Sequence, residues 1–109
     1  MNEEIKAQWI EALLSGEYKQ GKGALRNSKD EYCCLGVLCD LYSKNTGVEW
    51  GIDPLGSHNM HSNVSMTPVQ VDLWGEFANG TSGTLLELAE MNDFGRTFEQ
   101  IAEYIKEKL

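Results

Sequence analysis

The stretch Tyr32-Cys33-Cys34-Leu35-Gly36-Val37-Leu38-Cys39-Asp40-Leu41-Tyr42-Ser43-Lys44-Asn45 is the most apolar segment of this 109-residue chain. A helix that is apolar over so much of its surface belongs at the centre of a domain. Gly36 costs up to about 1 kcal/mol inside a helix, so we expect a close backbone approach at that position. Asn45-Thr46-Gly47 is expected to end the helix. The apolar residues that recur at helical spacing are Cys34, Leu35, Val37, Leu38, Leu41 and Tyr42.

Further helices are predicted on both sides of this segment. Residues 2–14 form an amphipathic pattern in which Asn2 can cap the first turn and Ser15-Gly16 can end the last. Downstream, three Thr residues are each followed three positions later by Glu or Gln, which is the pattern of a capping box. We therefore expect helices to begin at Thr67, Thr84 and Thr97.

Short strands are predicted in the segments that separate these helices. Residues 22–27 suit a short strand that leads into a polar turn at Asn27-Ser28-Lys29-Asp30. Residues 48–52 and 63–66 suit two more strands, joined by a loop rich in Ser, Asn and Gly. The fold class we expect is α+β: a mostly helical single domain over residues 1–109 with a small antiparallel sheet.

The composition is that of a globular domain, with 41% hydrophobic and 24% charged residues. This balance excludes a disordered chain, and no run of apolar residues is long enough to span a membrane. The acidic start, Met1-Asn2-Glu3-Glu4, does not fit a signal peptide, so we expect a cytoplasmic location. A net charge of −8 argues against binding to nucleic acid or to an anionic membrane.

The three cysteines, Cys33, Cys34 and Cys39, all lie in the predicted central helix. Adjacent cysteines rarely reach disulfide geometry, and the spacing lacks the separated ligand pairs of a zinc site. His58 and His61 form a His-x-x-His pair, but in a stretch without an evident rigid frame. We expect reduced, buried thiols and no bound metal.

One short stretch of this acidic chain is positively charged. Residues 19–29 carry a net charge of +4 without any acid, whereas residues 1–18 carry −3 and residues 30–109 carry −9. Glycine-flanked amides can form a nest for an anion, and Lys or Arg around them complete a phosphate site. Trp50, in the irregular segment, could stack on a base. The candidate ligand-binding residues are therefore Lys19, Gln20, Gly21, Lys22, Gly23, Arg26 and Trp50.

The alternative for this stretch is a solvated loop whose lysines keep an acidic protein soluble, with Trp50 in the core. A DNA-binding function fits less well. Residues 88–105 suggest two helices joined by a Gly-containing turn, but the second helix carries more Glu than Lys, and recognition helices are usually basic.

An enzyme also fits poorly. Cys33 could pair with His58 or His61, and Asp40 and Glu49 offer carboxylates for acid–base chemistry. However, the chain contains no P-loop, Gly-x-Ser-x-Gly, His-Glu-x-x-His or dinucleotide-binding motif. We therefore expect no catalytic residues and no cofactor.

The run YCCLGVLCD at residues 32–40 resembles a group of small accessory proteins of bacteriophages. Residues 9–26 and 88–95 resemble the same group, so the likeness covers most of the chain. The resemblance implies a phage origin and a small accessory role. It carries no catalytic assignment. Many such proteins act on the host, including its antiviral defences.

The function we expect is that of a non-enzymatic counter-defence protein in the host cytoplasm. It would bind and sequester a small phosphorylated ligand, with a nucleotide immune signal as the favoured class. The alternative is an inhibitor that docks on a basic host protein through its acidic surface, because opposite charges speed association. Homo-oligomerisation stays open at this stage.

Overall fold

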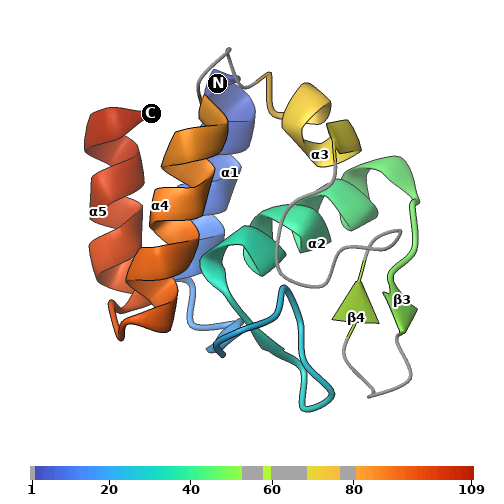
Figure 1. Cartoon of the computed structure of the whole chain (residues 1–109). Helices are drawn as coiled ribbons and strands as arrows, with labels where there is room; N and C mark the ends of the chain where they lie inside the picture. Colours follow the sequence, from blue (N-terminus) through green and yellow to red (C-terminus); the bar gives the residue numbers. More distant parts are fainter. Residues whose placement is uncertain (1, 53–57, 60–68, 77–80) are drawn as a thin grey trace.

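The computed structural model describes residues 2–52, 58–59, 69–76 and 81–109. The described part is mostly helical, with two pairs of two-residue strands, and is of the α+β class (Figure 1). No described helix is long and apolar enough to cross a membrane. The elements in chain order are α1 (Glu3–Leu14), β1 (Lys19–Gln20), β2 (Glu31–Tyr32), α2 (Cys34–Thr46), β3 (Gly51–Ile52), β4 (His58–Asn59), α3 (Val69–Trp74), α4 (Thr81–Asp93) and α5 (Phe98–Lys108).

Helix α2 is the central helix, as predicted, and its first seven residues are all buried. It begins two residues later than expected, because Tyr32 belongs to β2 and Cys33 is the N-cap. Gly47 ends it with φ of 80°, a left-handed conformation that glycine adopts at low cost. The expected close approach at Gly36 is confirmed, because a Cβ there would overlap the carbonyl oxygen of Leu25.

Helices α1, α4 and α5 lie side by side at one end of the molecule, and α2 packs against α1, α3 and α4 (Figure 1). Asn2 caps α1 as predicted, accepting a hydrogen bond from the Ile5 amide at 3.1 Å. Trp9 is fully buried and donates its indole N–H to the Cys34 carbonyl at 2.9 Å. The core side chains come from α1, Leu25, α2, Val71, α4 and α5: Ile5, Trp9, Leu13, Leu25, Cys33, Cys34, Leu35, Val37, Leu38, Cys39, Val71, Leu85, Leu88, Phe98, Ile101, Ala102 and Ile105.

The predicted helix starts have three different outcomes. The capping box at Thr97 is confirmed, with Thr97 and Gln100 each bonding the other's amide. The predicted start at Thr84 is wrong, because α4 already begins at Thr81. Thr67 lies outside the described residues, although α3 follows it at Val69.

The predicted strands are only partly correct. Residues 22–27 do not form a strand, because Gly23 has φ of 77°, which is incompatible with extended pairing, and only Arg26 makes isolated bridges. β3 covers just the last two residues of the segment 48–52, and residues 63–66 lie outside the described part. The expected turn at 27–30 is confirmed by the Asn27 side chain, which accepts the amides of Lys29 and Glu31.

The expectation of an antiparallel sheet also needs correction. β3 and β4 pair antiparallel, but β1 and β2 pair parallel. Tyr32 pairs with Arg26 across the tight turn in antiparallel sense and with Gln20 in parallel sense. The chain reverses its direction twice between residues 20 and 31, so β1 and β2 run in the same direction.

Candidate functional site

Asp40 is the centre of a cluster of polar and aromatic side chains where α2 faces β2 and residue 50. Its carboxylate accepts hydrogen bonds from the Tyr18 hydroxyl at 2.5 Å and from the Trp50 indole N–H at 3.1 Å. Lys44, one helical turn further along α2, lies 3.2 Å from the same carboxylate. The residue is only 8% exposed. Three donors therefore satisfy a carboxylate that burial alone would disfavour.

The electrostatics of this cluster follow from these bonds. Burial would raise the pKa of Asp40, but the hydrogen bonds from Tyr18, Trp50 and Lys44 outweigh it and hold that pKa below its usual value. Burial and the bond to Asp40 raise the pKa of Tyr18 to about 12. The Tyr18 hydroxyl and Asp40 likewise raise the pKa of Lys44. The carboxylate and the ammonium therefore stay charged at neutral pH, and the phenol stays neutral.

Four aromatic side chains extend from this cluster in an edge-to-face series. The ring centres are 4.9 Å apart between Tyr18 and Tyr32, and 6.3 Å apart between Tyr32 and Trp50. The Trp50 and His58 rings follow at 6.4 Å. Edge-to-face pairs are favourable because the positive ring edge meets the negative face. The series joins β2, residue 50 and β4 into one aromatic surface.

Arg26 lies against this aromatic surface. Its guanidinium carbon is 5.4 Å from the ring centre of Tyr32 and 5.7 Å from that of Trp50. Asp30 binds the same guanidinium, with its Oδ1 atom 2.8 Å from one terminal nitrogen and 3.0 Å from Nε. The Asp30 side chain is 63% exposed, against 22% for Arg26. The cation is thus held by partly buried rings on one side and by a solvated carboxylate on the other.

The turn between residues 27 and 31 positions Asp30. The Asn27 side chain accepts the amides of Lys29 at 2.9 Å and Glu31 at 3.0 Å. Asp30 has φ of 58°, a left-handed conformation that Asp and Asn adopt more readily than other non-glycine residues. The turn therefore directs Asp30 back to Arg26.

The structure divides the seven predicted ligand-binding residues into two groups. Arg26 and Trp50 come together in the aromatic cluster, as described above. The other five lie on β1 and the turn that follows it, and four of them contact neighbouring acids, amides or carbonyls of the chain. Lys19 pairs with Glu31 at 3.4 Å, and Lys22 is exposed.

The glycine amides proposed as an anion nest already have acceptors. The Gly21 amide donates to the Tyr32 carbonyl at 2.8 Å, and the Gly23 amide donates to the Asp93 carboxylate at 3.0 Å. An anion at this turn would have to displace Asp93. Both glycine amides are therefore engaged within the chain.

Asn92 of α4 holds the turn after β1 in place. It is fully buried, its amide nitrogen donates to the Gly21 carbonyl at 2.8 Å, and its oxygen accepts from the Cys34 amide at 3.2 Å. Gln20 donates to the same oxygen at 2.8 Å and to the Arg96 carbonyl at 2.6 Å. Gln20 and Gly21 thus have structural roles in joining β1 to α4 and α2.

Sequence reasoning missed three members of the cluster around Asp40, namely Tyr18, Tyr32 and Lys44. The spacing of Asp40 and Lys44 is a visible signal, because residues four apart on a helix are neighbours. Asp40 was considered only as half of a carboxylate pair. No local pattern links Tyr18, Arg26 and Trp50, which are far apart in the sequence.

The Cys and His residues considered for catalysis and metal binding have structural contacts in the fold. The Cys33 sulfur accepts the Gly36 amide at 3.4 Å, and burial raises the pKa of this thiol to about 11. The His58 ring bonds the Asn27 carbonyl at 3.2 Å, and His61 is outside the described residues. Among the residues that the structure places, no three His, Cys, Asp or Glu are grouped to hold a metal ion.

The comparisons with known proteins address the family rather than the activity. Neither a curated protein nor a solved structure matches this chain. A family model does match it, over residues 1–109. The chain therefore belongs to the family described as a domain of unknown function, DUF8296.

Proposed function

We propose that this protein is a phage accessory protein that binds and sequesters a small phosphorylated ligand without turning it over. The class of ligand we favour is a nucleotide signal of host immunity, met in the host cytoplasm. The observation that carries the proposal is the placement of Arg26 over the rings of Tyr32 and Trp50. The phage origin rests on the resemblance of residues 32–40 to phage proteins.

Arg26 is suited to bind an anion because its position is set before any ligand arrives. The two rings and the turn at 27–30 restrict the guanidinium, so little side-chain entropy remains to be lost on binding. Its carboxylate partner, Asp30, is mostly exposed. Because the Asp30 carboxylate is already largely solvated, a phosphate can replace it at Arg26 at small cost.

The rings beside Arg26 suit the rest of a nucleotide. A base can stack on the face of a Trp or Tyr ring whatever its sequence identity. The bond from the Trp50 indole to Asp40 fixes the ring's orientation. Lys22, which is exposed on the same turn-rich segment, adds a second cation for a phosphate.

Binding without turnover is supported by the state of the one nucleophile considered above. The Cys33 thiol is buried, and its pKa of about 11 keeps it protonated at neutral pH. The thiolate is the reactive form of cysteine. We expect a bound nucleotide to be recovered intact by chromatography after long incubation, and a clean product peak would contradict this part of the proposal.

The test is a thermal-shift screen with mono-, di- and cyclic nucleotides, followed by calorimetry on each nucleotide that stabilises the protein. Arg26→Glu and Lys22→Glu should each weaken binding by about tenfold or more, because a charge-assisted hydrogen bond contributes roughly 1.5–3 kcal/mol. Asp30→Asn should strengthen binding by roughly threefold, because it removes the competing carboxylate while Asn still tolerates the positive φ.

The matched control is Lys108→Glu, which changes the net charge by the same amount at the end of α5. We expect this variant to bind as the wild type does. Wild-type affinity in both Arg26→Glu and Lys22→Glu, with circular dichroism showing the native helix content, would overturn the site. The competing hypothesis, an inhibitor with an acidic docking surface, expects these two variants to bind a basic partner equally well or faster.

A further inference from the structure

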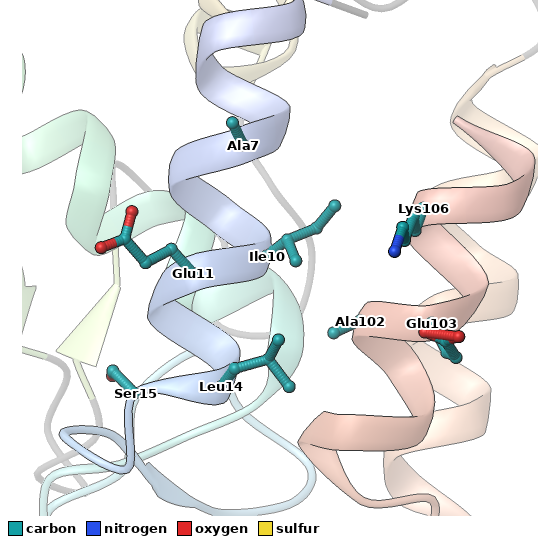
Figure 2. A pocket seen from close by; sticks show the side chains of 8 residues that line it. All are labelled: Ala7, Ile10, Glu11, Leu14, Ser15, Ala102, Glu103 and Lys106. Atoms are coloured by element: carbon teal, nitrogen blue, oxygen red, sulfur yellow. The ribbon is translucent and has the colours of Figure 1, made fainter.

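An apolar groove with a volume of about 660 Å³ lies between α1 and α5. Figure 2 shows Ile10 and Leu14 of α1 pointing toward Ala102 of α5. Ala7 and Ala102 have small side chains, so a third element can approach the two helices closely at this place. The groove shares no lining residue with the cluster around Arg26, so the inference drawn from it is independent of the proposed ligand.

The groove exposes apolar surface that the described part of the chain leaves uncovered. Leu14, the last residue of α1, is 55% exposed, whereas Trp9 on the same helix is fully buried. Large apolar side chains gathered in a hollow, unlike single ones scattered on a surface, mark sites of interaction. The hollow between two packed helices has the shape that a third helix fills.

The charges around the groove are mainly acidic. Glu11 borders it on α1, and Glu103 and Lys106 border it on α5. The two helices together carry six Glu and three Lys, so each has a net negative charge. The whole chain has a net charge of −8, so two copies repel each other. This disfavours a second copy as the occupant and favours a basic one.

We propose that the groove between α1 and α5 binds an amphipathic basic helix of a partner protein. Apolar residues of that helix at successive turns contact Leu14, which is 55% exposed, and the partly buried Ile10. Its flanking Lys and Arg residues face Glu11 and Glu103. The apolar contacts supply most of the affinity, and the charges supply the association rate and the preference for a basic partner.

The probe for this proposal is a fluorescein-labelled amphipathic peptide of about 18 residues, long enough to form a helix, with Leu on one face and Lys on the flanks. Fluorescence anisotropy measures its binding to the full chain. Leu14→Lys should weaken binding by about tenfold, because it removes a central apolar contact and adds a repelling charge. Glu103→Lys should also weaken binding, and the wild-type affinity should fall as salt is added.

Leu86→Lys on α4 is the matched control, because Leu86 is 49% exposed, does not line the groove and undergoes the same substitution. We expect it to keep the wild-type affinity. Equal weakening by Leu14→Lys and Leu86→Lys would show that net charge alone attracts the peptide, and would overturn the proposal. So would equal binding of a peptide with Glu in place of Lys. A wild-type dimer in sedimentation that Leu14→Lys converts to a monomer would assign the groove to a second copy instead.

Discussion

Asp40 joins three parts of the chain that are distant in sequence. It lies on the buried side of α2 and accepts hydrogen bonds from Tyr18 and Trp50, while Lys44 balances its charge. Removal of the carboxylate would leave the Tyr18 hydroxyl and the Trp50 indole without their acceptor. An unsatisfied buried donor costs about 1–3 kcal/mol. The hydrogen bond to Asp40 therefore helps to hold the Trp50 side chain against α2.

The raised pKa of Tyr18 makes stability depend on pH in the alkaline range. In the unfolded chain this phenol ionises near its ordinary pKa of 10.0, but in the folded chain it stays protonated up to about 12. The unfolded state therefore loses a proton first, and the free energy of unfolding falls as pH rises from about 10 to about 12. In Tyr18→Phe this fall should be smaller, as measured by urea unfolding across the same pH range.

Tyr42→Phe serves as the control for this measurement. Tyr42 belongs to α2, and its ring packs edge-to-face on Trp74, with the ring centres 5.5 Å apart, rather than on a ring of the Asp40 cluster. This variant keeps the bond between Tyr18 and Asp40, so we expect it to keep the fall in stability that this bond causes. An unchanged slope in Tyr18→Phe would mean that the bond to Asp40 does not set the protonation of this phenol.

At the scale of elements, the contact between α2 and the segment before the turn decides the packing of the candidate site. The Cys33 amide donates to the Leu25 carbonyl at 3.2 Å, and Gly36 faces the same carbonyl. Leu25 is fully buried, and the next residue is Arg26. The absence of a side chain at Gly36 therefore lets α2 support the backbone that presents Arg26 to Tyr32 and Trp50.

Gly36→Ala should destabilise the protein, although alanine is the better helix former. The gain in helix propensity is about 1 kcal/mol. The new Cβ would overlap the Leu25 carbonyl oxygen, and backbone moves less easily than a flexible side chain. Overpacking of this kind costs about 1–3 kcal/mol, and we expect the upper end of this range in urea unfolding.

Gly47→Ala is the comparison that separates a clash from backbone strain. Gly47 has φ of 80°, but a Cβ there would meet nothing within 4 Å. Its substitution should cost about 1–2 kcal/mol from the left-handed conformation alone. A Gly36→Ala variant more stable than the wild type would show that α2 and residue 25 can separate without loss.

At the scale of the whole molecule, α2 packs against α1, α3, α4 and β2 (Figure 1). The buried side chains of α1, α2, α4 and α5, together with Leu25 and Val71, belong to one core cluster. All three cysteines are in it. We therefore expect the core formed by the described residues to open as a unit.

This arrangement predicts that the cysteines report on global unfolding. Burial raises the pKa of Cys33 to about 11 and that of Cys34 well above its usual value. Reaction with a thiol reagent should therefore be much slower in the native protein than in denaturant. The reaction rate should follow the unfolded fraction as urea is added.

Mass spectrometry after partial labelling supplies the control for this prediction. Molecules labelled at all three cysteines and unlabelled molecules should dominate if opening is global. A large population labelled at Cys33 alone would show that the N-terminus of α2 opens locally. Stoichiometric zinc in protein purified without added metal would contradict the separate prediction that the cysteines hold no metal.

The candidate site shows where prediction from the sequence stops. Arg26 and Trp50 were both predicted as ligand contacts, and the structure brings their side chains together. The role of Gly21 and Gly23 as an anion nest was inferred from composition alone. Their amides are engaged by Tyr32 and Asp93, which no spacing within residues 19–29 could indicate.

The amino-acid sequence by itself determined the helix ends at Asn2, Gly47 and Thr97, the central place of α2 and the acidic charge. Each helix end depends on hydrogen bonds or a backbone angle within about four residues, and burial of α2 follows from its apolar composition. Tertiary structure alone decided the parallel pairing of β1 with β2, the Asp40 cluster and the groove between α1 and α5. These features join segments tens of residues apart, so they arise only when the whole core packs and distant polar groups must find partners.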